Sequence, residues 1–271
     1  MKQMKSAFCF ILILIGLGSD VASAKEEAKK IQDNSFLIEE AYNQEPGVIQ
    51  HIQTFQYLNR SKTWGYSFTQ EWPVQGQAHQ LSYTIPLNHL GVPPHETGLG
   101  DVALNYRYQL VLKEAIALAP RFSLLLPTGD SKKGLGSGAI GLQTNIPLSV
   151  ELSDKWVTHL NLGFTLTPSS KEPGGAIADT LGFNCGASLI WLATENFNLM
   201  LELAWNSAEA VREDGSRTRN DTFLVAPGAR FAINFESGLQ IVPGIAIPIG
   251  LGPSKDEFGI FSYLSFEHPL F

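Results

Sequence analysis

The stretch that decides the fold is residues 64–72, WGYSFTQEW, in which apolar and polar side chains alternate. One set of alternate positions is aromatic, at Trp64, Tyr66, Phe68 and Trp72, and the other set is small or polar. A period of two puts successive side chains on opposite faces of a β-strand. The stretch therefore predicts a strand with one apolar face and one polar face.

The same alternation recurs along the rest of the chain, in segments of about ten residues bounded by turn residues. It predicts about twelve strands, within a range of ten to fourteen. The first is ambiguous in its facing and the last alternates less cleanly. The expected strands are residues 48–58, 64–72, 80–87, 101–110, 116–126, 140–148, 156–166, 181–191, 198–206, 223–235, 239–249 and 258–267.

The connections between these strands alternate in length, which separates two all-β architectures. The short connections are residues 73–77, 111–115, 151–155, 192–196 and 236–238. The longer ones are residues 88–98, 127–137, 167–179, 207–220 and 250–257. Tight turns on one side and long loops on the other are typical of outer-membrane barrels. We therefore predict an all-β fold, an up-and-down antiparallel transmembrane β-barrel, with a soluble β-sandwich as the alternative.

The N-terminal residues predict export. Lys2 and Lys5 precede an apolar run over residues 7–17, and Ala22 and Ala24 form an A-x-A cleavage site. We expect residues 1–24 to be a signal peptide, residues 25–47 an N-terminal segment and residues 48–271 the barrel. The segment 25–47 could fold into the lumen as a constriction or lie in the periplasm as a short helix or docking arm, and we favour the periplasm.

Composition excludes some partners. The chain has 19 Lys and Arg against 26 Asp and Glu, a net charge of −7, which disfavours nucleic acid. Of the two cysteines, Cys9 lies in the predicted signal, so Cys185 alone leaves no internal disulfide in the mature chain. No mature segment reaches 18 consecutive apolar residues, so we expect no transmembrane helix.

Four stretches resemble a known family. They are FLIEEAYNQEPG at 36–47, LGDVALNY at 99–106, LPTGD at 126–130 and YLSFEHP at 263–269. Together they resemble the outer-membrane proteins grouped as the MetA-pathway of phenol degradation family, and the resemblance covers most of the mature chain. It implies a Gram-negative outer-membrane barrel with a transport role and no defined substrate. We expect outer-membrane lipid, a small-molecule solute and, during biogenesis, the barrel assembly machinery as partners.

In a closed membrane barrel the polar faces of the strands line the lumen. The lumen-lining residues that we expect are Glu71, Asp101, Asn105, Arg107, Arg121, Asn145, His159, Asn161, Glu202, Arg230 and Asn234. They either border a narrow aqueous path for small solutes or brace one another as a plug of salt bridges. Four inward glycines, Gly163, Gly182, Gly186 and Gly228, favour open space slightly.

No catalytic or metal-binding pattern stands out. His79 and Ser82 would lie on opposite faces of a strand, and His159 with Asn161 has no identifiable serine beside it. His89 and His95 share a loop with Glu96, but the other histidines are scattered. We expect no enzyme, no cofactor and no metal.

The sequence therefore favours a passive outer-membrane channel for a small solute, hydrophobic or aromatic, that crosses a polar lumen. The competing hypothesis is a non-conducting structural or adhesive barrel that acts through its extracellular loops. Neither hypothesis fixes the oligomeric state.

Overall fold

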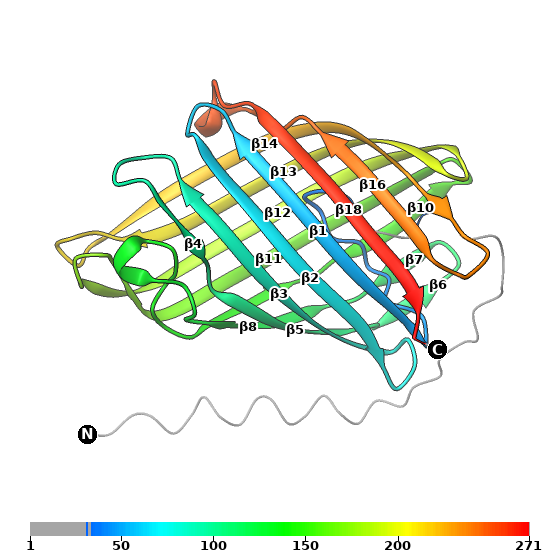
Figure 1. The fold of residues 1–271 in the computed structure, drawn as a ribbon, viewed down its shortest axis with the longest axis horizontal. Helices are drawn as coiled ribbons and strands as arrows, with labels where there is room; N and C mark the ends of the chain where they lie inside the picture. The colour runs from blue at the N-terminus through cyan, green and yellow to red at the C-terminus, as the bar shows by residue number, and fades with distance from the viewer. Residues whose placement is uncertain (1–30, 32–33, 271) are drawn as a thin grey trace.

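The protein folds into a closed antiparallel barrel of twelve strands, which confirms the predicted fold class (Figure 1). The structure is a computed structural model that describes residue 31 and residues 34–270, so the predicted signal peptide lies outside the described residues. Strand β1 (Val48–Leu58) pairs with β2 (Thr63–Val74) and also with β18 (Gly259–Pro269). The pairing of the first strand with the last closes the barrel and leaves no free sheet edge.

Some barrel strands are single and others are interrupted. The single strands after β2 are β3 (His79–Leu90), β11 (Trp156–Lys171), β12 (Ile177–Thr194) and β13 (Phe197–Val211). The interrupted ones are β4 (Glu96–Leu99), β5 (Val102–Tyr108) and β6 (Val111–Lys113); β7 (Ile116–Leu118) and β8 (Arg121–Leu126); β9 (Gly141–Asn145) and β10 (Leu148–Ser153); β14 (Arg217–Phe231) and β15 (Ile233–Asn234); and β16 (Gln240–Ala246) and β17 (Ile249–Gly250).

Prolines mark three of these interruptions. Pro120 precedes β8, Pro147 separates β9 from β10, and Pro248 separates β16 from β17. Because proline has no N–H to donate, it stands where the hydrogen-bond ladder is broken. Two short 3-10 turns, Ser131–Lys133 and Gly252–Ser254, lie in loops. No helix among the described residues has the length and apolarity to cross a membrane.

Apolar side chains are outside the barrel and polar side chains are inside it. The side chains of Leu162 and Phe122 are 61% and 54% exposed, whereas Glu202 and Arg230 are 0% and 1% exposed. A water-soluble protein shows the opposite arrangement. The apolar faces predicted from the alternation are thus the surface that a bilayer would cover.

The two ambiguous strands acquire definite faces. Ile52 of β1 is buried, and Phe55 points outward with 37% exposure. On β18, Phe261 and Tyr263 are buried while Ile260 is exposed. The last strand therefore departs from the simple pattern because it presents two aromatic rings to the interior.

The predicted long loops at residues 167–179 and 207–220 are mostly strand. The pairing of β11 with β12 extends to Lys171 and Ile177, and the pairing of β13 with β14 extends to Val211 and Arg217. Ion pairs of Glu209 with Arg217 and Arg219, at 3.3 and 3.0 Å, join the two strands of the second hairpin near its tip. Polar cross-strand pairs keep the ladder intact beyond the apolar band, so polarity there did not indicate a loop.

A pair of substitutions tests which surface meets lipid. Leu162 lies in the middle of β11, and Leu152 lies at the end of β10 beside a turn; both are similarly exposed, at 61% and 58%. We expect Leu162→Arg to lower the free energy of unfolding by about 2–4 kcal/mol and Leu152→Arg by about 0–1 kcal/mol. Denaturant unfolding in phospholipid vesicles measures both. Equal costs at the two depths would contradict a bilayer around this surface.

Candidate functional site

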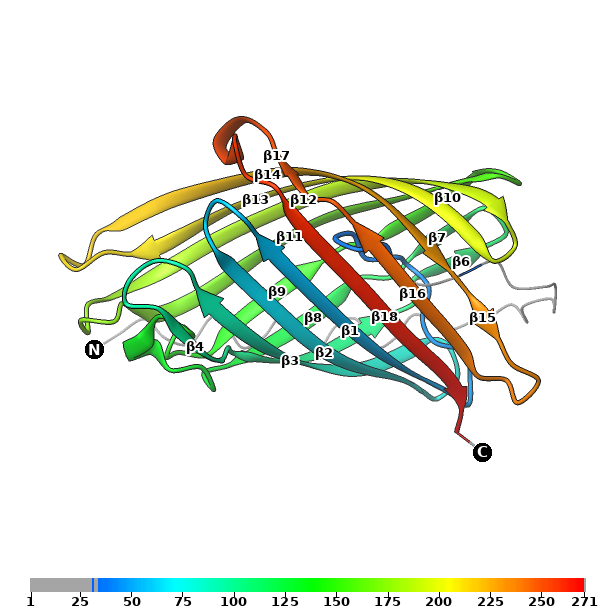
Figure 2. The ribbon, with the colours of Figure 1, turned by 45° about the horizontal axis from the view of Figure 1, so that its top comes forward.

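The candidate site is the barrel interior, which contains the chain's own N-terminal segment. Residues 34–47, here called the lumenal segment, loop inside the barrel and are hydrogen bonded to its inward side chains (Figures 1 and 2). Of the two positions considered from the sequence, the favoured periplasmic one was wrong for these residues. Residues 25–30, 32 and 33 lie outside the described residues.

Glu202 of β13 holds the start of the lumenal segment. Its two carboxylate oxygens accept hydrogen bonds from the backbone N–H groups of Phe36 and Leu37, each at 3.0 Å. The side chain is fully buried. A buried carboxylate needs such donors, because desolvation otherwise costs several kcal/mol, by order of magnitude. This irregular segment therefore supplies donors that no strand supplies.

Arg230 of β14, which carries the opposite charge to Glu202, binds the same part of the lumenal segment. Its guanidinium donates to the backbone carbonyls of Asn34, at 2.7 Å, and Ile31, at 3.2 Å. Acidic and basic residues of the wall thus engage N–H and C=O groups respectively. The wall recognises the backbone of the segment more than its side chains.

Two arginines hold the later part of the lumenal segment: Arg121 binds the turn at residues 36–39, and Arg107 binds residues 40–43. Arg121 of β8 forms a two-pronged ion pair with Glu39, at 2.6 and 3.0 Å. Arg107 of β5 donates to Asn43 Oδ1 at 2.9 Å and to the carbonyls of Glu40 and Tyr42 at 3.2 and 2.5 Å. Five donor hydrogens in a rigid fork suit this multiple contact.

Neutral side chains complete the attachment. Asn161 of β11 accepts from the N–H of Glu39 at 2.9 Å and donates to its carbonyl at 2.8 Å. The hydroxyl of Ser149 accepts from the N–H of Ala41 at 2.8 Å and also contacts His159 Nδ1 at 2.7 Å. His159 therefore positions a serine hydroxyl that binds backbone, and this hydroxyl has a structural partner.

Inward glycines make room for the side chains of the segment. A Cβ atom on Gly186 would collide with Ile38, and one on Gly228 or Gly244 would collide with Phe36. Phe36 also packs on Phe261, with ring centroids 5.7 Å apart. The prediction that Gly186 and Gly228 favour open space was therefore wrong: their missing side chains are replaced by the lumenal segment.

The eleven residues predicted to line the lumen divide into three groups. Arg107, Arg121, Asn161, Glu202 and Arg230 bind the lumenal segment directly. Four others are connected to the segment indirectly, because each is hydrogen bonded to a residue that binds it. These intermediate residues are Gln80 for Glu71, Arg121 for Asn105, Asn161 for Asn145 and Ser149 for His159.

Asp101 and Asn234 lie apart from the segment. The carboxylate of Asp101 accepts from the backbone of Gly129 and Ser137, at 3.0 and 2.7 Å, and so anchors the loop after β8. Asn234 is exposed and bonds to Asn196 and Gln240 at 2.9 and 2.7 Å near two turns. Both lie at strand ends. A side chain on the polar face there contacts loops and turns and does not line the lumen.

Sequence reasoning missed other wall residues that hold the segment. Gln109 Oε1 accepts from Asn43 N–H at 2.8 Å, and Gln80 Oε1 accepts from Gln44 N–H at 2.7 Å. Both glutamines lie within predicted strands, at residues 80–87 and 101–110, but neither was among the predicted lumen-lining residues. The run EEAYNQE at 39–45, too polar for a strand, was the available signal.

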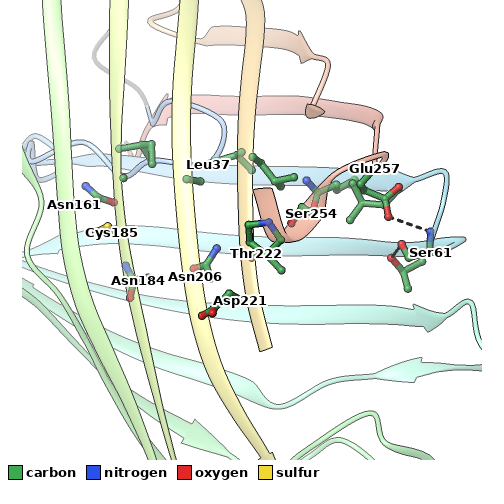
Figure 3. A pocket seen from close by; sticks show the side chains of 18 of the residues that line it. Leu37, Ser61, Asn161, Asn184, Cys185, Asn206, Asp221, Thr222, Ser254 and Glu257 are labelled. Atoms are coloured by element: carbon green, nitrogen blue, oxygen red, sulfur yellow. Dashed lines mark hydrogen bonds between the residues drawn. The ribbon is translucent and has the colours of Figure 1, made fainter. Parts of the chain in front are cut away.

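A cavity of about 760 Å³ lies between the lumenal segment and the loops that contain Ser61 and Glu257 (Figure 3). Leu37 and Ile38 of the lumenal segment line it, together with Asn161, Asn184 and Asn206 of strands β11, β12 and β13. We call this cavity the outer vestibule. Its full lining also includes Gln56, Leu58, Arg60, Ser61, Thr63, Cys185, Gly186, Ala204, Asp221, Thr222, Leu224, Pro253, Ser254 and Glu257.

At the rim of the outer vestibule, Glu257 ties two loops together. Its carboxylate accepts from the backbone N–H groups of Arg60 and Ser61, at 2.7 and 3.0 Å. Burial raises the pKa of Glu257, but these N–H donors lower it by more, so the pKa lies below its ordinary value. The ionised carboxylate therefore fixes the rim at neutral pH.

Removing the charge of Glu202 should loosen the lumenal segment. In Glu202→Gln one acceptor oxygen becomes an NH₂ group that faces a backbone N–H. Leaving one buried donor unsatisfied costs about 1–3 kcal/mol. We expect amide hydrogen exchange at residues 36–38 to rise by one to two orders of magnitude.

Glu209→Gln is the matched control, because Glu209 lies on the same strand but pairs with Arg217 and Arg219. It should leave exchange at residues 36–38 unchanged. Equal protection of these amides in wild-type protein and Glu202→Gln would show that the carboxylate does not hold the segment.

Comparisons with known proteins identify the fold and no family. No family model matches the chain, and no curated protein matches it. The resemblance to the MetA-pathway of phenol degradation family therefore stays a prediction.

Two solved structures share the architecture. A crystal structure of an outer-membrane channel from Pseudomonas putida F1 is similar at a TM-score of 0.64 and 13% identity, over 84% of this chain and 97% of that chain. The NanC porin is similar at a TM-score of 0.53 and 8% identity, over 81% of this chain and 100% of that chain. The fold is thus one that outer-membrane channels and porins also have.

Proposed function

We propose that the protein is an outer-membrane channel in which the lumenal segment closes the passage and moves to let a small solute through. The observation that carries the proposal is that Leu37 and Ile38 of the lumenal segment line the outer vestibule. These two residues belong to a segment that hydrogen bonds and packing hold in the barrel, and not to a barrel strand. A closure made this way can open while the barrel remains intact.

The lining of the outer vestibule supports a solute with an apolar body and a polar group. Leu37, Leu58 and Leu224 offer apolar surface, and the asparagines of the wall offer donors and acceptors. The side-chain nitrogen of Gln56, which also lines the cavity, is buried without a hydrogen-bond partner among the described residues. A solute oxygen would satisfy that donor. We therefore propose a small hydrophobic or aromatic solute with a polar substituent.

The alternative is a non-conducting surface barrel. The filled interior and the tall hairpins β11–β12 and β13–β14 favour it, since both would suit a barrel that only displays its outer end. Conductance separates the two functions, provided that the segment can be fixed and released at will.

A disulfide lock does this. Ser35 Oγ lies 3.0 Å from Ser188 Oγ of β12, so cysteines at both positions are within reach of a disulfide. The background is Cys185→Ser, which removes the native thiol. We expect unitary currents in planar bilayers from the reduced Ser35→Cys, Ser188→Cys protein and their loss after oxidation. Reductant should restore them.

Ser35→Cys alone in the same background is the control, and its currents should not respond to oxidant. Currents that persist in the oxidised double variant would show that solutes bypass the segment. A barrel that is silent in the reduced state, and also after deletion of residues 34–44, would establish the non-conducting alternative.

The solute class has its own test. A small uncharged aromatic alcohol added on the loop side should block the current in a saturable way. Leu224→Ala removes apolar surface and should weaken the block about three- to tenfold, the effect of about 1 kcal/mol. Asp221→Asn should leave it unchanged, because the solute has no charge. Block that depends on Asp221 and not on Leu224 would indicate a cationic solute instead.

A further inference from the structure

The closure of the barrel brings together two histidines that are far apart in the sequence. His51 of β1 and His268 of β18 are 217 positions apart, yet their Nε2 atoms lie 3.2 Å from each other. The rings are stacked, with centroids 5.3 Å apart and planes inclined by 19°.

We propose that this pair binds a divalent transition-metal ion, Zn²⁺ in the first place, which clasps the first barrel strand to the last. Two nitrogens on a tetrahedral zinc at 2.0–2.1 Å lie roughly 3.3 Å apart. The separation of 3.2 Å matches this distance with hardly any movement. Imidazole nitrogen is also a preferred ligand for Zn²⁺ and Cu²⁺.

The hydrogen bonding of His268 directs its lone pair toward the site. Nδ1 of His268 lies 2.9 Å from the carbonyl oxygen of Pro269, which can only accept. The proton is therefore on Nδ1, and Nε2 carries the lone pair that faces His51. A backbone carbonyl that fixes the other ring nitrogen is the usual outer support of a metal-binding histidine.

His51 is held from its other side. Its ring stacks on Phe68 of β2, with centroids 6.1 Å apart and planes inclined by 26°. Without metal, His51 Nε2–H donates to His268 Nε2. When metal binds, the proton of His51 resides on Nδ1 and both Nε2 lone pairs coordinate the ion, so the two rings stay neutral.

The surroundings fit a clasp with water on the remaining positions. The described residues contain no group of three or more His, Cys, Asp or Glu that could hold a metal ion, so the protein supplies these two ligands. Both histidines lie near the end of the β1–β18 ladder, which finishes at the pair Val48 and Pro269. That end of the ladder is followed by the last described residue, Leu270, and corresponds to the side of short turns, which in membrane barrels is the periplasmic side and has access to water.

A metal here would act on barrel closure. The β1–β18 pairing is the one contact between neighbouring barrel strands that the order of the described chain does not provide through a hairpin. An ion that binds only the closed barrel stabilises it by mass action. The proposal is independent of conduction and stands whether or not the barrel is a channel.

The test uses the full mature protein in detergent, without a polyhistidine tag and stripped with chelator. Isothermal titration with Zn²⁺ should show one site per barrel, and saturation should raise the midpoint of thermal unfolding. His51→Asn and His268→Asn should each weaken binding at least tenfold and abolish the thermal shift. His89→Asn is the control, since His89 stacks on Trp64 and His95 at a distance from the seam, and should bind as wild type.

Cu²⁺ provides a second readout that does not depend on stability. Its paramagnetic resonance spectrum should show two coordinated nitrogens in the wild type and one or none in each single variant. Zn²⁺ binding that survives both substitutions, or is absent at millimolar zinc, would overturn the proposal. If one variant fails to fold, the other strand's variant still decides the outcome.

Discussion

The structure depends on how the barrel interior satisfies charges that it removes from water. Glu202 and Arg230 are almost completely buried, and Arg107 is 3% exposed. Each would destabilise the fold strongly if left alone, because an uncompensated buried charge costs several kcal/mol, by order of magnitude. The backbone N–H and C=O groups of the barrel strands are hydrogen bonded to neighbouring strands and are not available to these side chains. A segment without regular structure has free backbone groups of both kinds, and the lumenal segment uses them to neutralise the wall.

This arrangement explains the sequence features that a barrel alone does not require. Glycine normally weakens a strand, but the glycines at 186, 228 and 244 leave the space that Phe36 or Ile38 occupies. The two inward aromatics of β18 break the alternation because Phe36 packs on them. The segment and the wall therefore pack together closely, as the residues of a protein core do.

Much of the fold could be predicted from the sequence, because a period of two is a local property of each strand. The alternation at 64–72 gave the facing of β2 and needed no knowledge of its neighbours. The interior was harder to predict. The sequence showed that Arg107 and Glu202 point inward, but both open water and a folded segment satisfy polar groups. Only the contacts of residues 34–47 distinguish the two.

The length of strands and the seam were unpredictable for a related reason. The pairs Glu209 with Arg219 and His51 with His268 join residues whose proximity follows from register. Register is a property of two strands together, and for His51 and His268 it requires closure of the whole barrel. A histidine count could not have revealed this pair.

The distribution of the bonds also determines how the passage could open. The turn at residues 36–39 of the lumenal segment is held by two hydrogen bonds to Glu202, two to Asn161 and the ion pair of Glu39 with Arg121. Hydrogen bonds to a charged group contribute about 1.5–3 kcal/mol each and neutral ones about 0.5–1.5 kcal/mol, so releasing the four hydrogen bonds costs roughly 4–9 kcal/mol and opens the turn in about one molecule in a thousand or fewer. Expelling the whole segment would also break the contacts of Arg107 and Arg230, and would expose Phe36. Local movement of the turn therefore costs less than expulsion of the segment, and the turn carries Leu37 and Ile38, which line the outer vestibule.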